Sequence, residues 1–204
     1  MSYFPSTTLE DVWPNITTDN KAAIQQDLQR IFVSLRSLEL PPGQKLGGVN
    51  GEGVQDFYMD DHEEQQAMTI SDFEDFQFSV SQYPPSKAWT SFLRNFLPQP
   101  NYKVVFTHGD IPPANIMVML DAANDKYIVS GIIDWERSGF YPEYFESVQV
   151  LHLFDRNVEN DWYKYIPPCI SPERHPERFL VGRIWGLSIG FSAIKVDNYY
   201  TAAK

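Results

Sequence analysis

The sequence lacks the features that mark secreted and membrane proteins. Its 204 residues include one cysteine, Cys169, so no internal disulfide can form, and this favours a reducing compartment. No apolar run approaches the roughly eighteen residues that a membrane-spanning helix needs. The first residues, MSYFP, have neither the basic nor the apolar region of a signal peptide. These absences predict a cytoplasmic protein that does not enter a membrane.

Positive charge is also scarce. There are 16 Lys and Arg residues against 27 Asp and Glu, which gives a net charge of −11. Nucleic acid is therefore not an expected partner, because neutralising phosphates requires clustered basic side chains. What the chain does have is apolar material, at 43% hydrophobic and 15% aromatic residues. That is enough to bury a core, and the length fits one domain, over 1–204, or one lobe of a larger one.

The most informative stretch is 104–118, VVFTHGDIPPANIMV, which reads as an apolar strand, a sharp polar loop and a second apolar strand. Asp110 stands where the first strand has ended, and Asn115 stands just before the next apolar run. The prolines at 112 and 113 stiffen the loop between them. A further run, 127–133, ends in Asp134, and a turn at 124–125 makes the two later strands neighbours. We therefore expect Asn115 and Asp134 to flank one small space.

These polar groups allow two kinds of chemistry. Carboxylate and amide oxygens are the ligands that a hard cation such as Mg²⁺ prefers. One of the carboxylates can instead orient or deprotonate a hydroxyl. Taken singly, an Asp after a Gly is usually a turn residue, and a strand-end Asp is usually a solvated cap. It is the joint spacing that favours a catalytic site.

The pattern His108-x-Asp110-x-x-x-x-Asn115, followed by Ile133-Asp134-Trp135-Glu136, resembles the catalytic segment of the protein-kinase-like superfamily, and of the aminoglycoside phosphotransferase family in particular. The Tyr-Pro-Glu-Tyr form at 141–144 is similar to the fungal branch of that family. The resemblance implies that Asp110 is the catalytic base, that Asn115 and Asp134 bind magnesium, and that His108 is a structural residue that pins the loop. It also implies ATP and Mg²⁺ as cofactors and a hydroxyl of a small molecule as the acceptor.

The resemblance covers the C-terminal lobe. No G-x-G-x-x-G followed by a strand lysine is present, and the glycine-rich segment 47–53 is expected to be a flexible loop. We therefore expect an α+β, mostly helical fold, the C-terminal lobe of a kinase-like protein with a small β-hairpin carrying the catalytic loop and without the nucleotide lobe. The first functional hypothesis is an ATP-dependent phosphotransferase acting on a small molecule. The alternative is a catalytically impaired pseudokinase or truncated homologue that acts as a binding module. A metal-dependent hydrolase using His108, Asp110 and Asp134 is disfavoured, because no further His lies nearby to complete a zinc shell.

The remaining periodicity predicts the helices. They are expected over 18–38, in two pieces over 70–97, over 143–155, over 159–166, and from Pro172 or Pro176 to Leu187. Trp135 is expected in the core. In the bacterial members of the resembled family an Asp opens the helix after the catalytic strands. Here Glu143 or Glu146 is the candidate to replace it in holding the catalytic segment.

Overall fold

The computed structural model describes residues 7–55, 67–79, 85–99, 101–151 and 160–189. They form an α+β fold with two small antiparallel sheets. The strands are β1 (Thr7–Thr8), β2 (Gly47–Gly48), β3 (Val104–Thr107), β4 (Ile116–Asp121), β5 (Lys126–Ile132) and β6 (Gly139–Pro142). The α-helices are α1 (Leu9–Val12), α2 (Thr18–Leu35), α3 (Ile70–Gln77), α4 (Lys87–Arg94), α5 (Phe145–Gln149) and α6 (Pro176–Ser188). Short 3₁₀ turns are η1 (Trp13–Asn15), η2 (Pro113–Asn115), η3 (Trp162–Lys164), η4 (Pro168–Ile170) and η5 (Pro172–Arg174).

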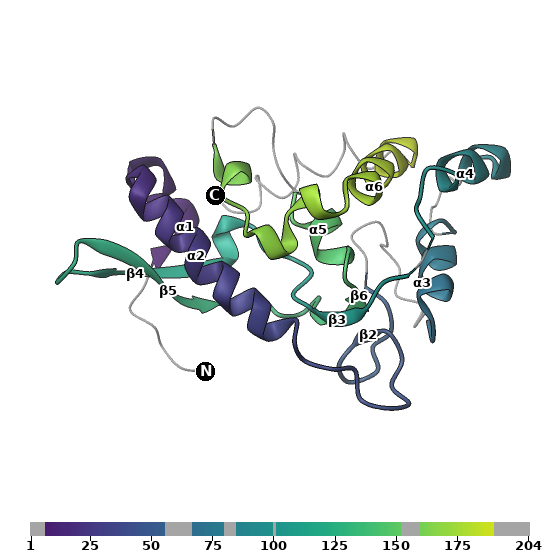
Figure 1. Cartoon of the computed structure of the whole chain (residues 1–204), viewed down its shortest axis with the longest axis horizontal. Helices are drawn as coiled ribbons and strands as arrows, with labels where there is room; N and C mark the ends of the chain where they lie inside the picture. Colours follow the sequence, from purple (N-terminus) through teal and green to yellow (C-terminus); the bar gives the residue numbers. More distant parts are fainter. Residues whose placement is uncertain (1–6, 56–66, 80–84, 100, 152–159, 190–204) are drawn as a thin grey trace, which may run out of the picture.

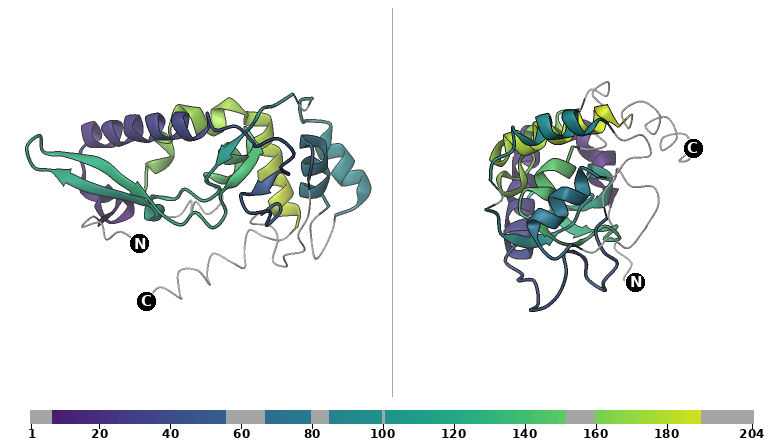
Figure 2. Two further views of the ribbon diagram at one scale, coloured as in Figure 1. Left: turned by 90° about the horizontal axis from the view of Figure 1, so that it is seen from below. Right: turned by 90° about the vertical axis from the view of Figure 1, so that its right-hand side faces the viewer.

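The molecule is elongated, and its two ends differ in content. The β4–β5 hairpin and the long helix α2 lie side by side at one end, and α3 and α4 lie at the other (Figures 1 and 2). One sheet has the order β1-β4-β5 and the other has the order β2-β6-β3. The predicted hairpin is confirmed, since β4 and β5 pair antiparallel from Ile116–Ile132 to Asp121–Lys126. Its tight connection contains Asp125 at a φ of 52°, a left-handed conformation that Asp tolerates in turns.

Helix α2 closes the exposed edge of this hairpin. Strand β5 is at the edge of its sheet, so some of its N–H groups have no strand partner. The Asn20 side chain accepts the Tyr127 N–H at 2.9 Å, and the Asp27 carboxylate accepts the Val129 N–H at 3.3 Å. Beside these two polar side chains α2 buries Ile24, Leu28 and Phe32 in the core beneath the hairpin. The helix therefore accepts hydrogen bonds from two N–H groups of the edge strand and also covers the core beneath the sheet.

Capping explains where the helices begin. The side chains of Thr8, Thr17, Thr69 and Ser86 each accept a backbone N–H in the first turn of α1, α2, α3 and α4. At its other end α2 stops three residues short of the predicted position. The chain there closes with i to i+3 bonds, Ser37 N–H to Ser34 O and Leu38 N–H to Leu35 O, both at 3.1 Å. Leu38, the last residue of the predicted helix, is 49% exposed.

Three other predictions on local structure need correction. The segment 47–53 is not merely a flexible loop, because Gly47 and Gly48 pair with Phe140 and Gly139 as an edge strand. A helix was predicted over 143–155, but the α-helix spans only Phe145–Gln149, and 152–159 lie outside the described residues. The split helical region between 70 and 97 is confirmed by α3 and α4, and the last helix begins at Pro176. The aromatic segment at 159–166 forms only the single 3₁₀ turn η3.

Three apolar clusters make up the core. The first joins α1, α2, the hairpin and η4, and it includes Ile111 from the loop after β3. The second joins β6, α5 and α3 around Phe73, Tyr141 and Phe145, whose rings contact one another. The third is smaller and joins α4 to α6 through Leu93, Val181 and Trp185. The segment from 108 to 115 runs between the first two clusters, from one sheet to the other.

Candidate active site

The polar loop predicted from the sequence links the two sheets. It leaves β3, which belongs to the sheet β2-β6-β3, and it enters β4, which belongs to the sheet β1-β4-β5. Gly109 has a φ of 84°, and a Cβ there would lie 2.7 Å from the Arg137 carbonyl oxygen. Only glycine fits this turn without displacing the neighbouring chain. The tight crossing brings the loop directly against the segment that follows β5.

His108 ties the two segments together. Its side chain is fully buried, its Nδ1 accepts the Asp110 N–H at 3.2 Å, and its Nε2 lies 3.0 Å from the Ile133 carbonyl oxygen. Since Nδ1 accepts, Nε2 carries the proton and donates to Ile133. Burial lowers the pKa of His108 to about 4, so the ring is neutral at physiological pH. The His108 side chain therefore links the loop to the strand end beside Asp134 through two hydrogen bonds.

Asp110 lies in a partly desolvated and acidic place. The pKa of the Asp110 carboxyl is raised to about 6, mainly by burial; the positive charge of Arg137 opposes this, and the negative charges of Asp134 and Glu136 add to it. The following residue, Ile111, is buried in the first core cluster and fixes the backbone. The Asn115 amide nitrogen donates to the Asp110 carbonyl oxygen at 3.2 Å and closes the loop on itself. A carboxylate held this way is more basic than an ordinary aspartate but still ionised at neutral pH.

Asn115 and Asp134 stand at the open end of the hairpin. Asn115 directly precedes β4, and its carbonyl oxygen accepts the Ile133 N–H at 3.0 Å. Asp134 comes one residue later, with a φ of 64° that is unusual for a residue with a side chain. Among the described residues, neither the Asn115 side-chain oxygen nor the Asp134 carboxylate makes a hydrogen bond. The structure thus brings Asp110, Asn115 and Asp134 to one strand junction. Within the described ranges, the side-chain oxygens of Asn115 and Asp134 are free to bind a cation there.

Glu146 holds the loop from beneath. Its carboxylate accepts the His108 N–H at 2.7 Å and the Gly109 N–H at 3.2 Å. Glu146 is fully buried, which raises its pKa to about 7 against the opposing effect of those two hydrogen bonds and of Arg36. The other candidate, Glu143, instead accepts the Lys103 N–H at 3.3 Å. The available signal was an acidic residue between the apolar Phe145 and Val148, but sequence alone left two candidates.

Trp135 is not a core residue as predicted. It is 37% exposed, and its indole covers His108, with ring centroids 4.4 Å apart. Its Nε1 donates to the Ile132 carbonyl oxygen at 2.8 Å. The strand ends at Ile132, so the chain is free to turn the indole outward over the histidine. Trp135 therefore covers the His108 ring instead of packing in the core.

The donor set suits an oxygen-preferring cation better than zinc. In the part of the chain that the structure describes, no three His, Cys, Asp or Glu side chains gather into a metal-holding group. The shell that the hydrolase hypothesis requires is therefore not formed by these residues. A carboxylate from Asp134 and an amide oxygen from Asn115, with solvent completing the shell, match what Mg²⁺ accepts.

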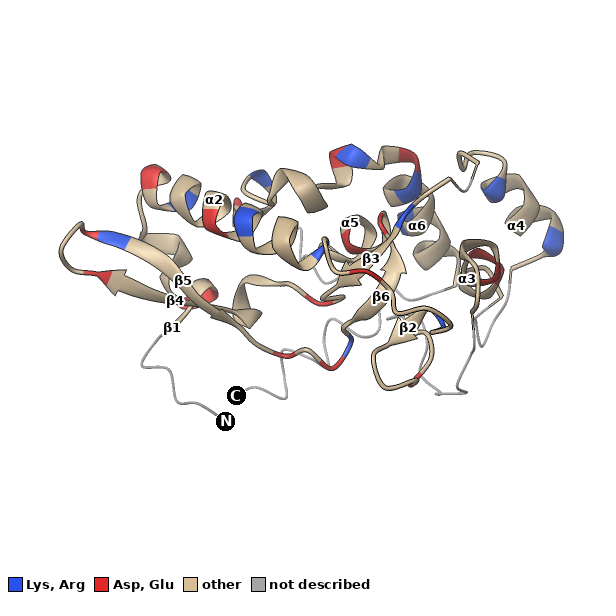
Figure 3. Cartoon of the chain, turned by 60° about the horizontal axis from the view of Figure 1, so that its bottom comes forward, with Lys and Arg blue, Asp and Glu red and all other residues tan. Residues whose placement is uncertain are grey.

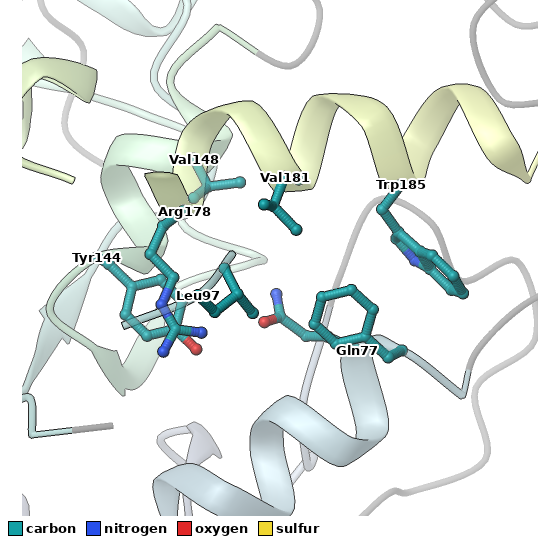
Figure 4. Close-up of a pocket in the computed structure, with 9 residues that line it drawn as sticks. Gln77, Leu97, Tyr144, Val148, Arg178, Val181 and Trp185 are labelled. Atoms are coloured by element: carbon teal, nitrogen blue, oxygen red, sulfur yellow. The ribbon is translucent and has the colours of Figure 1, made fainter. Parts of the chain in front are cut away.

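A separate small cavity lies under α6 (Figure 4). It has a volume of about 30 Å³, with Val181 and Trp185 of α6 on one side and Gln77 of α3 on the other. That space holds one or two waters and no larger ligand. None of the predicted site residues lines it, so it has no part in the chemistry proposed below.

Comparison with known proteins shows the family of the chain. A family model described as phosphotransferase enzyme family matches residues 1–166. No curated protein matches the chain. No helix within the described ranges is both long and apolar enough to cross a membrane.

Proposed function

The chain belongs to the phosphotransferase enzyme family, whose model covers most of its length, and from this premise we propose that it transfers the γ-phosphoryl group of ATP to a hydroxyl of a small molecule. The observation that carries the proposal is the junction of β3, β4 and β5. One loop and one strand end bring a raised-pKa carboxylate beside two unengaged oxygen donors.

Each residue has a defined task in this proposal. Asp110 orients the acceptor hydroxyl and takes its proton as the oxygen attacks the γ-phosphorus, while the bond to ADP breaks. Its raised pKa suits a base that works near neutral pH. Asn115 and Asp134 would hold Mg²⁺, which when bound neutralises charge on the phosphates. His108 and Glu146 touch no reacting atom in this scheme and act by positioning the loop.

The left-handed backbone of Asp134 supports the same proposal. A left-handed backbone costs energy in a residue with a side chain, although less in Asp than in most, and such positions concentrate at functional sites. Here the flanking Ile133 is held on both sides, through its N–H to Asn115 and through its carbonyl to His108. The strand end is thus fixed, and the carboxylate points from a rigid support.

The first test is the thermal stability of the purified chain with and without Mg-ATP. A ligand that binds only the folded state adds about 2.7 kcal/mol at a hundredfold excess over its Kd. We expect a rise in Tm that requires Mg²⁺ and is lost in Asp134→Ala. The matched control is Asp125→Ala, which also places alanine at a positive φ and removes a carboxylate, but at the far end of the hairpin. The control should keep the full shift.

The second readout is ADP release with a panel of small-molecule alcohols. Asp110→Asn should lower the turnover of any active acceptor at least a hundredfold, with the Mg-ATP shift in Tm retained. A Mg²⁺-dependent shift without turnover on any acceptor would favour the alternative, a binding module that retains the site. No shift at millimolar Mg-ATP would contradict nucleotide binding by this chain.

A further inference from the structure

A second feature of the sequence is independent of the strand junction. Between Asp75 and Asp110 the chain has no Asp or Glu, although 27 acidic residues occur in the whole sequence. The same stretch carries Lys87, Arg94 and Lys103. In a protein with a net charge of −11, this is a local reversal of sign. Figure 3 shows it on α4, which has Lys or Arg near both ends and no acidic residue.

A groove lies along the polar face of α4. It has a volume of about 610 Å³, within the range of small-molecule sites. Lys87, Thr90, Ser91 and Arg94 line it at helical spacing i, i+3, i+4 and i+7, so they share one face. Among the described residues, the lining is Phe78, Ser79, Pro85, Lys87, Thr90, Ser91, Arg94 and Asn95.

The helix that carries these side chains is well anchored. Ser86 caps its first turn by accepting the Trp89 N–H at 3.2 Å. Leu93 is buried against Val181 and Trp185, and the Trp89 indole N–H donates to the Ser188 hydroxyl at 2.9 Å. The apolar face of α4 thus packs on α6, and this leaves the basic face of α4 on the groove. A site on a packed helix needs little ordering when a ligand binds.

The charges in the groove are available to a ligand. Within the described residues, Lys87 has no carboxylate at ion-pair distance. Arg94 contacts Asp75 at 2.6 Å, but that carboxylate is 64% exposed, and exposed pairs contribute little. The Arg94 guanidinium also lies 5.6 Å from the centre of the Phe78 ring, so cation and ring adjoin each other. None of the described residues that line the groove is acidic.

We propose that the groove between α4 and the end of α3 binds a phosphorylated small molecule, with its phosphate on Lys87 and Arg94. Ser91 and Asn95 supply further hydrogen-bond donors, and Phe78 with Pro85 supplies an apolar wall for the organic part. Two cations from one helix face recognise a dianion more strongly than a carboxylate. The site is distinct from the strand junction, since none of Asp110, Asn115 and Asp134 lines it. It does not depend on the proposed transferase activity.

The test uses phenyl phosphate and inorganic phosphate as probes, added to the whole chain without Mg²⁺, with binding followed by calorimetry. We expect saturable binding of phenyl phosphate, tighter than that of inorganic phosphate because of the apolar wall. In Lys87→Gln/Arg94→Gln the affinity should fall roughly a hundredfold, about tenfold for each charged contact. Backbone amide signals of 87–95 should shift on titration of the wild-type protein.

The control is Lys126→Gln/Arg30→Gln. It also removes one lysine and one arginine charge, but on β5 and α2, away from the groove. Like Arg94, Arg30 pairs with an aspartate of the chain, Asp27, so both doubles lose one surface ion pair. The control should bind within about twofold of the wild-type protein.

Equal loss of affinity in both double variants would show that only net charge matters and would overturn the proposal. The absence of saturable binding at millimolar phenyl phosphate would overturn it as well. Binding lost in Asp134→Ala but kept in Lys87→Gln/Arg94→Gln would assign the phosphate to the strand junction instead.

Discussion

Glu146 carries its carboxyl group where water does not reach. The ionised form accepts two loop N–H groups, which stabilises it, but the loss of hydration outweighs this and raises the pKa from 4.5 to about 7. Between those values the folded protein holds a proton that the unfolded chain has released. This group's contribution to the free energy of unfolding therefore falls as the pH rises from about 4.5 to about 7.

Glu146→Gln should remove that trend. Relative to the wild-type protein, the variant's free energy of unfolding should improve by on the order of 2 kcal/mol between pH 5 and pH 7.5. His108, whose pKa is lowered, contributes with the opposite sign in both proteins and cancels in the difference. Urea unfolding of both proteins across this range measures it. The matched control is Glu143→Gln, on a partly exposed carboxylate that accepts a different backbone N–H. Parallel pH curves for the two variants would contradict the prediction.

Residue types and spacing were enough to predict that four polar groups come together. His108, Asp110, Asn115 and Asp134 lie at one junction because strand ends and a short loop leave their side chains few directions. The choice between Glu143 and Glu146 was out of reach, because it depends on which way α5 turns against β3. The position of Trp135 was wrong for a related reason. An indole that follows a strand end can lie inside or across its surface, and composition does not distinguish the two.

At the scale of the elements, the contact between β2 and β6 depends on bare backbone. A Cβ on Gly139 would lie 2.2 Å from the Gly47 carbonyl oxygen, which no side chain tolerates without a shift of the chain. Glycine is depleted in strands, so residue propensity did not indicate that 47–48 would pair. The helices were easier to predict, because caps and apolar periodicity are both local signals.

Gly139→Ala should destabilise the protein by about 2 kcal/mol or more through this overlap. Gly131→Ala is the matched control, since a Cβ there would have Met117 Cβ as its nearest neighbour, 4.0 Å away. That variant should stay within about 1 kcal/mol of the wild-type protein. Both values can be read from chemical denaturation with far-UV circular dichroism. Similar losses in the two variants would mean that the β2–β6 contact is looser than the structure indicates.

At the scale of the whole molecule, a buried ion pair links α6 to α3. The Arg178 guanidinium of α6 contacts the Glu74 carboxylate of α3 at 2.5 Å, with side-chain exposures of 3% and 8%. Arg178 also lies over the Tyr144 ring, 4.4 Å from its centre, and donates to the Pro98 carbonyl oxygen at 3.2 Å. Segments far apart in the sequence are thus joined through one side chain. Such long-range pairing, like the division of the strands between two sheets, is not encoded in any local pattern.

Arg178→Met should cost about 3–5 kcal/mol, because it leaves the Glu74 charge buried and uncompensated. Arg178→Met/Glu74→Leu should regain part of that loss, since the orphaned charge is removed as well. The surface pair of Arg30 and Asp27 is the reference, with Arg30 79% exposed, and Arg30→Ala should cost less than about 1 kcal/mol. Thermal unfolding of the four proteins gives the comparison. If Arg178→Met is no worse than Arg30→Ala, the pair does not join α3 to α6.

The buried Cys169 has a practical consequence. Its backbone N–H is held by the Gln29 side chain at 2.9 Å, and its thiol, whose pKa burial raises, lies in the cluster between η4 and α2. A thiol-specific reagent therefore cannot react until this packing opens. As the sole cysteine of the chain, Cys169 is a natural probe of local opening. The rate at which it is labelled under native conditions counts the openings of α2 from η4, without any introduced probe.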